Sequence, residues 1–67
     1  MQDTEIQKLD LYLKNMFGPG ISAKPRINQL DSAEVFMKSE FIGLVYRDDE
    51  EGEVSYNFCM PILSEDL

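Results

Sequence analysis

The sequence predicts an α+β fold in which one N-terminal helix packs on a four-stranded antiparallel β-meander. Near the N-terminus, apolar residues recur at three- and four-residue spacings, which is the period of a helix with one buried face. After residue 20 the spacing changes to two, as in strands with one buried face. Short groups of turn-forming residues separate these strands, so consecutive strands can pair as antiparallel hairpins.

The helix is predicted to begin at Thr4 and to end near Phe17. Thr4 is a suitable N-cap, and Gln7 stands at the position of its capping-box partner. Gly18 and Pro19 predict the end, because glycine accepts the left-handed conformation and proline cannot continue a helix. The apolar face expected to pack on the sheet consists of Ile6, Leu9, Leu13, Met16 and Phe17.

Two strands are predicted in the middle of the chain. Residues 21–27 alternate between apolar and polar side chains, and Pro25 places this strand at a sheet edge, since proline has no N–H to donate to a neighbour. Residues 33–38 alternate in the same way. The intervening residues 28–32 are predicted to form a loop.

A longer hairpin follows and holds most of the aromatic and branched residues. Residues 41–46 are apolar apart from Gly43, as is typical of a central strand. Residues 54–62 alternate between large apolar side chains and small or polar ones, which indicates a strand with one buried face. The acidic residues 48–51 and Gly52 predict the loop between them, because glycine can adopt the positive φ of a hairpin turn.

Short turns between the strands predict the register and therefore the two faces of the sheet. A turn at Ser39 and Glu40 pairs Val35 with Leu44, and the acidic loop then pairs Leu44 with Tyr56. The inner face, expected to lie under the helix, consists of Val35, Met37, Ile42, Leu44, Tyr46, Val54, Tyr56, Phe58 and Met60.

The same register predicts an interaction surface on the opposite face of the sheet. One helix cannot cover both faces, and an exposed apolar patch typically marks a surface for protein binding or self-association. A weak two-fold homodimer through this face is expected. The alternative is that a helix end or residues 62–67 fold over the patch. The residues of this predicted face are Phe36, Phe41, Val45 and Cys59.

Length and charge narrow the class of protein. A chain of 67 residues predicts one small domain over residues 1–67. Thirteen acidic against six basic side chains give a net charge of −7, which repels phosphate backbones and anionic lipids, so neither nucleic acid nor a membrane is an expected partner.

A single cysteine excludes an internal disulfide, and the first residues lack the features of a signal peptide. We therefore expect a cytoplasmic protein.

The sequence predicts no catalytic, cofactor or metal site. Without histidine, neither a Cys-His nor a Ser-His arrangement can form. The acidic residues 48–51 lack the ligand spacing of an EF-hand, so a solvated turn is expected there. Cys59 is expected to be an inert small apolar side chain, with a redox or modification site as the alternative.

Several stretches carry a resemblance to a known family. They are QKLDLYLKNMFG at 7–18, AKPR at 23–26, DSAEV at 31–35, EFIGLVYRD at 40–48, and SYNF at 55–58 with Met60. On these residues the chain resembles a family of short, uncharacterised alphaproteobacterial proteins defined as a domain of unknown function. The resemblance covers nearly the whole chain and implies a cytoplasmic bacterial protein with a single domain. It brings no activity, ligand or catalytic residue.

These observations predict a non-enzymatic cytoplasmic protein-interaction module with an unidentified protein partner. The alternative is a small metal- or metabolite-responsive accessory subunit of an enzyme. Such a subunit would use the acidic loop or the polar atoms of Tyr46 and Asn57. A ligand retained through purification, or melting that depends on calcium or magnesium, would favour the alternative.

Overall fold

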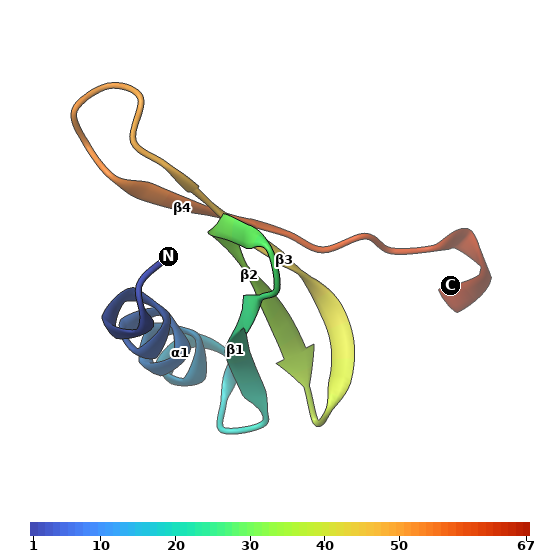
Figure 1. Ribbon diagram of the computed structural model, residues 1–67. Helices are drawn as coiled ribbons and strands as arrows, with labels where there is room; N and C mark the ends of the chain where they lie inside the picture. The colour runs from blue at the N-terminus through green and yellow to red at the C-terminus, as the bar shows by residue number, and fades with distance from the viewer.

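The computed structural model describes residues 1–67 and has the predicted architecture of one helix and a four-stranded antiparallel sheet (Figure 1). The strands lie in the order β1-β2-β3-β4, which confirms the meander. The elements are α1 (Asp3–Phe17), β1 (Ile21–Arg26), β2 (Gln29–Met37), β3 (Glu40–Asp48), β4 (Ser55–Cys59) and a short 3₁₀ helix, η1 (Ser64–Asp66). The predicted loop at residues 28–32 is wrong, because Ile27 and Asn28 alone form the turn, with a positive φ of 65° at Asn28, and β2 already begins at Gln29.

The end of α1 was predicted correctly, but its start was not. The helix ends at Phe17, where Gly18 adopts a φ of 98° and its N–H donates to the Lys14 carbonyl at 2.9 Å. The N-cap is Gln2 instead of Thr4, and its backbone N–H donates to Glu5 Oε1 at 3.1 Å. A glutamate at the third helical position therefore replaces the predicted Thr4 cap.

The turn between β2 and β3 lies one residue earlier than predicted. Lys38 and Ser39 form it with φ angles of 51° and 71°, and Met37 pairs with Glu40 across it. Positive φ at both central residues is the conformation of a type I′ hairpin turn, whose twist matches that of the two strands. Lys38 and Ser39 are not the Asn-Gly or Asp-Gly pairs that usually mark a type I′ turn. The sequence therefore gives no strong signal for the position of this turn.

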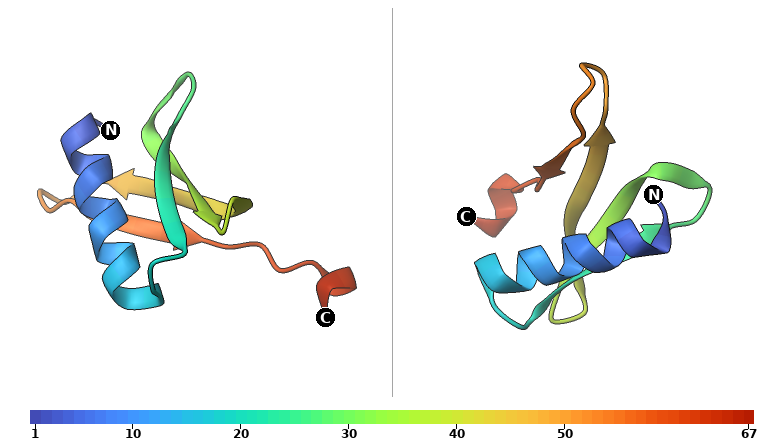
Figure 2. Two further views of the ribbon diagram at one scale, coloured as in Figure 1. Left: turned by 90° about the horizontal axis from the view of Figure 1, so that it is seen from below. Right: turned by 90° about the vertical axis from the view of Figure 1, so that its left-hand side faces the viewer.

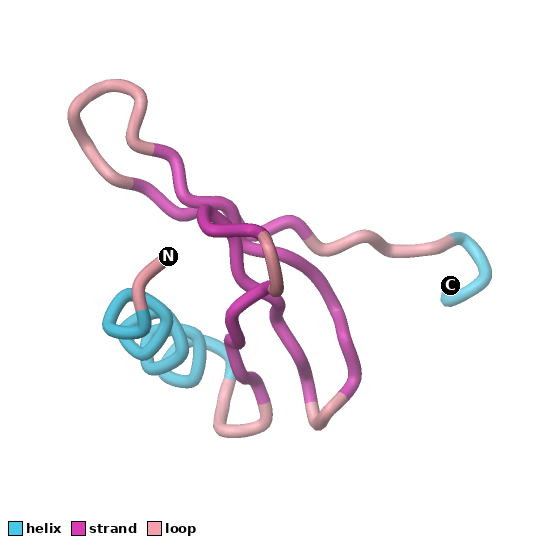
Figure 3. Tube along the Cα trace, in the orientation of Figure 1, coloured by secondary structure: helices cyan, strands magenta, loops and turns pink.

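A bulge follows this turn directly. Phe36 pairs with Phe41, whereas Val35 pairs with Gly43, so Ile42 is an extra residue in β3. Because side chains alternate between the faces of a strand, one extra residue moves every later side chain of β3 to the other face. β3 and its neighbours are also strongly curved, as Figure 3 shows.

The predicted inner face of β3 is consequently wrong beyond the bulge. Val45 was expected on the uncovered face, yet it is only 1% exposed and belongs to the core. Leu44 and Tyr46 flank Val45 in the strand, so their side chains lie on the face away from the helix, and Tyr46 is exposed. The bulge is the physical reason for the exchange.

The pairing of β3 with β4 differs from the predicted register by three residues. Val45 pairs with Phe58, and Arg47 pairs with Tyr56 in place of the expected Leu44. The predicted register is displaced by one residue in the β2–β3 hairpin and by three residues in the β3–β4 hairpin. Because the total displacement is even, Tyr56 and Phe58 still lie on the helix side of the sheet, as predicted. The loop between the strands therefore ends later than expected, and β4 begins at Ser55.

The core is small and lies between α1 and the first three strands. Figures 1 and 2 show α1 beside β1, while the β3–β4 hairpin extends beyond the helix. All five residues of β4 are exposed. The helix thus covers one side of the sheet at β1 to β3 and leaves the inner face of β4 largely open. The buried core cluster is Ile6, Leu13, Ile21, Ala23, Val35 and Val45.

The two edge strands of the sheet differ in whether their free backbone groups are covered. At the β1 edge, Asp10 Oδ1 accepts a hydrogen bond of 2.9 Å from the backbone N–H of Ala23, and Pro25 has no N–H to offer. β4 forms the other edge and has no element beside its outer side. An exposed, unpaired strand edge is a template for pairing with another chain.

Residues 60–67 leave the sheet after β4 and extend away from α1, ending in η1 (Figure 1). They do not fold over the outer face of the sheet, which was one expectation for this segment. Ile62, Leu63 and Leu67 are 65%, 54% and 93% exposed. We call residues 60–67 the C-terminal arm.

Candidate binding groove

An apolar groove of about 750 Å³ lies between α1 and the inner face of β3 and β4. It exists because α1 packs closely on β1 while the β3–β4 hairpin curves away, which leaves apolar side chains facing one another without filling the space between them. Eight of its ten lining residues are apolar or aromatic, and these line both walls. The groove is lined by Glu5, Lys8, Leu9, Tyr12, Leu13, Met16, Phe17, Val45, Tyr56 and Phe58.

The helix wall of the groove runs along α1 from Glu5 to Phe17. Tyr12, Met16 and Phe17 follow the helical spacing of the apolar stripe, yet all three are more than half exposed. Across the groove, the ring of Phe58 meets that of Phe17 edge to face at a centroid distance of 6.4 Å. Apolar area of this kind remains in water unless something occupies the groove.

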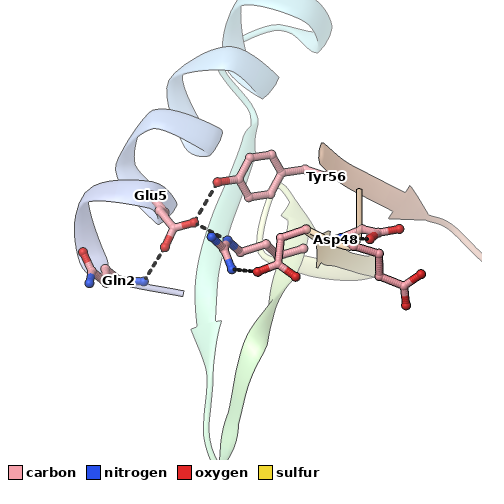
Figure 4. Close-up of polar contacts among 7 residues, drawn as sticks. Gln2, Glu5, Asp48 and Tyr56 are labelled. Carbon is pink, nitrogen blue, oxygen red and sulfur yellow. Dashed lines mark hydrogen bonds and ion pairs between the residues drawn. The ribbon is translucent and has the colours of Figure 1, made fainter. Parts of the chain in front are cut away.

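A polar cluster closes the end of the groove near the helix N-terminus (Figure 4). The Tyr56 hydroxyl donates a hydrogen bond of 2.7 Å to Glu5 Oε2, and Arg47 Nε forms an ion pair of 3.0 Å with the same oxygen. Arg47 Nη1 also donates to Asp49 Oδ2 at 3.1 Å. One carboxylate thus joins α1, β3 and β4, and Arg47 connects it to the acidic loop.

The cluster shifts the ionisation of two of its members in opposite directions. The hydrogen bond from Tyr56, together with the backbone N–H of Gln2 and the charge of Arg47, lowers the pKa of Glu5 below its ordinary value. The same hydrogen bond, with partial burial and the negative charge of Glu5, raises the pKa of Tyr56. At neutral pH the pair is therefore a carboxylate that accepts from a neutral phenol, an arrangement that holds β4 against the helix.

The predicted interaction face is only partly assembled. Phe36 and Phe41 lie together on the outer face, with their rings edge to face at 5.8 Å, and Lys24 Nζ lies 5.4 Å from the centroid of the Phe36 ring. Val45 is absent from this face because it is buried under the helix. Cys59 is exposed and pairs with Leu44, whose side chain also lies on the outer face. Leu44 and Tyr46 lie on the outer face in place of Val45, and Lys24 partly covers Phe36.

The acidic loop brings no set of three metal-ligating side chains together. A second hollow, of about 320 Å³, is lined by carboxylates of this loop, and Asp48 Oδ1 accepts the backbone N–H of Glu50 at 3.0 Å. No group of three or more acidic, histidine or cysteine side chains converges as metal ligands. The hydrogen bond from Glu50 is the local bond typical of an Asx turn.

Sequence reasoning missed the groove, although two of its signals were present. Met16 and Phe17 were expected to pack on the sheet because they continue the helical stripe, and Tyr56 and Phe58 were expected on the inner face. The stripe is longer than the sheet area that α1 covers. Only the angle between α1 and the β3–β4 hairpin leaves a groove there, and that angle depends on the curvature of the sheet (Figure 2).

Comparison with known proteins identifies the family of this chain. A family model described as Protein of unknown function (DUF3126) matches residues 5–66, and the chain belongs to this family. No curated protein and no solved structure matches the chain. No helix is both long enough and apolar enough to cross a membrane.

Proposed function

Because membership of this family brings no assigned activity, we propose from the site itself that the chain is a non-enzymatic, cytoplasmic protein-interaction module. The groove between α1 and β4 binds an extended apolar segment of a protein partner. The observation that carries this proposal is the pair of facing apolar walls, with Tyr12, Met16 and Phe17 on one side and Phe58 on the other. Exposed aromatic and methionine side chains are enriched at protein interfaces.

The surroundings of the groove also suit a polypeptide. The open edge of β4 lies beside the apolar wall and carries backbone groups without a neighbouring strand. An extended segment in the groove can therefore contact side chains and also form main-chain hydrogen bonds with that edge. The polar cluster at Glu5 limits the groove at one end.

Site-specific photo-crosslinking in the native cell tests this proposal. A photoreactive phenylalanine analogue replaces Tyr12, which lines the groove, or Tyr46, a matched exposed tyrosine on the other face of the sheet. We expect a covalent adduct with one defined polypeptide at position 12 and none at position 46. The purified polypeptide should then bind the chain, and Phe58→Glu should weaken binding at least tenfold. Equal adducts at both positions, or no adduct at position 12, would contradict the proposal.

The groove volume also supports the alternative of a metabolite-responsive accessory subunit. About 750 Å³ lies within the range of about 300 to 1,000 Å³ found for small-molecule sites. In that case native mass spectrometry of the purified chain would show a retained small molecule that Met16→Glu removes. Calcium or magnesium would shift the melting temperature only if the acidic loop bound the ion. A ligand-free spectrum together with the Tyr12 adduct favours the interaction module.

A further inference from the structure

The folded chain exposes too much surface for its size. Its accessible surface is 5316 Å², whereas a compact monomer of 7.7 kDa is expected to expose about 4,300 Å². Its radius of gyration is 12.3 Å, against about 10.9 Å expected for a compact chain of this length. The excess of about 1,000 Å² is close to the roughly 800 Å² that each partner buries in a standard protein interface.

The C-terminal arm accounts for much of this shape. It extends away from the body, and its apolar residues Ile62, Leu63 and Leu67 are exposed (Figure 1). Its origin is fixed, because the chain at Cys59 and Met60 passes so close to Gly43 that a side chain at position 43 would overlap the Cys59 carbonyl oxygen. From this point the arm runs away from its own α1 in Figure 1 and in the left view of Figure 2, so it does not reach the groove of its own chain.

We infer that the groove is filled by the C-terminal arm of a second copy of this chain, in a two-fold dimer in which each arm lies in the groove of the other subunit. This inference rests on the proposed function and names the partner. Each chain carries one apolar groove and one apolar arm that its own fold leaves uncovered, so a reciprocal exchange satisfies both. Two-fold closure limits the assembly to a dimer.

The chemistry of the arm matches that of the groove. The apolar residues Ile62 and Leu63 meet the walls formed by Met16 and Phe58. The acidic end of the arm, at Glu65 and Asp66, is complementary to Lys8, the only basic residue that lines the groove. Burial of large apolar side chains stabilises such a contact against the repulsion between two chains of net charge −7.

The outer face of the sheet is a weaker candidate for the dimer contact. Phe36 and Phe41 already pack against each other, and Lys24 lies over Phe36. Val45, which was expected to extend this patch, is buried in the core. A dimer contact through this face, which also carries Leu44 and the exposed Tyr46, would leave both the groove and the arm uncovered.

Sedimentation velocity from micromolar to near-millimolar concentration, at low and high salt, tests the dimer. The wild-type chain should form a dimer that salt strengthens, because screening weakens the repulsion between the subunits. Ile62→Glu in the arm and Met16→Glu in the groove should each raise the dimer dissociation constant at least tenfold. Leu30→Glu introduces the same charge at an exposed site in β2 and should leave the dimer unchanged apart from a small electrostatic effect.

A mixing experiment distinguishes an exchange of arms from any other dimer. A chain with Met16→Glu keeps a normal arm, and a chain with Ile62→Glu keeps a normal groove. Their mixture can therefore form a heterodimer with one intact contact, whereas each variant alone has none. We expect the mixture to associate more strongly than either variant alone, with circular dichroism confirming that both variants are folded.

Photo-crosslinking from position 62 locates the contact directly. Cross-linked peptides should join the arm of one chain to residues 8–17 of another, which isotopically labelled and unlabelled chains distinguish from intramolecular products. The inference is wrong if the chain stays monomeric at near-millimolar concentration, or if Phe41→Glu abolishes the dimer while Ile62→Glu does not. A monomer whose position 12 still cross-links to a different polypeptide would retain the proposed function and exclude the second copy as occupant.

Discussion

The hydroxyl of Tyr56 donates a hydrogen bond of 2.7 Å to Glu5 Oε2 and so joins β4 to the first turn of α1 across 51 residues of sequence. Arg47 forms an ion pair with the same carboxylate oxygen. These contacts are the polar connection between the helix and a strand whose residues are all exposed. They fix one end of the groove and, with it, the distance between its two walls.

This relationship predicts a measurable change in the ionisation of Tyr56. Its pKa is raised because Glu5 accepts a hydrogen bond from the neutral phenol and opposes formation of the phenolate. Glu5→Gln removes the negative charge, so the pKa of Tyr56 should fall toward the usual value of about 10. Ultraviolet titration measures it, with the Tyr56→Phe spectrum subtracted to remove Tyr12 and Tyr46. An unchanged Tyr56 titration in Glu5→Gln would show that the hydrogen bond does not form in solution.

Asp10 predicts how stability depends on pH. Its pKa is lowered, first by the hydrogen bond from Lys14 and also by the backbone N–H of Ala23. The unfolded chain binds a proton on Asp10 more readily than the folded one does, so this contribution to stability is present above about pH 4 and is lost as the pH falls through the lower, folded pKa.

Asp10→Ala should therefore reduce the free energy of unfolding at pH 7 by about 1 kcal/mol, because about a quarter of the side chain remains exposed and weakens the charged hydrogen bond. The difference from wild type should shrink as the pH falls below about 4. Urea unfolding over this pH range measures it, with Asp31→Ala as a control in which the carboxylate forms no hydrogen bond or ion pair with α1. A constant difference at all pH values would show that Asp10 acts by packing alone.

The bulge in β3 predicts which valine stabilises the fold. Val45 is 1% exposed and Val54 is 49% exposed. Val45→Ala should cost about 2 kcal/mol of unfolding free energy, because it removes two buried methyl groups and leaves a cavity. Val54→Ala should change it by less than about 0.5 kcal/mol. Urea denaturation of both variants compares them, and the reverse order would support the register without a bulge.

A substitution at Gly43 tests how closely the end of β4 and the start of the C-terminal arm pack on β3. A Cβ at this position would meet the Cys59 carbonyl and Met60 Cα, which are backbone atoms that cannot move aside without shifting β4. Gly43→Ala should therefore lower stability by about 1 to 3 kcal/mol. Gly20→Ala is the matched control, since its Cβ would meet only the flexible side chains of Met37 and Lys38.

Amide hydrogen exchange shows whether the effect of Gly43→Ala is confined to β4. The displacement of β4 should raise the exchange rates of the amides in Ser55–Cys59 more than those of β1 and β2. A uniform increase over all four strands would mean that the substitution destabilises the sheet as a whole and does not release β4 and the arm in particular.

The sequence by itself determined the elements and their order. The stripe of apolar residues and the Gly18 stop define a helix that ends at Phe17, and the two-residue period defines four strands joined by short turns. These signals are local, because helix ends and strand alternation depend on residues within a few positions of one another. Consecutive antiparallel hairpins then leave few alternatives to the observed meander.

Only the tertiary structure decided which face each later residue occupies and where the chain leaves apolar surface uncovered. The bulge at Ile42 moved Val45 into the core and Tyr46 out of it, and the only local signal of it is the adjacent Gly43, since an isolated glycine within a strand can mark a bulge. Likewise, Met16 and Phe17 have the spacing of buried helix residues, but the position of α1 over β1 leaves them in a groove. Register and packing depend on contacts between residues far apart in the sequence, and a one-residue difference in pairing reverses every side chain that follows.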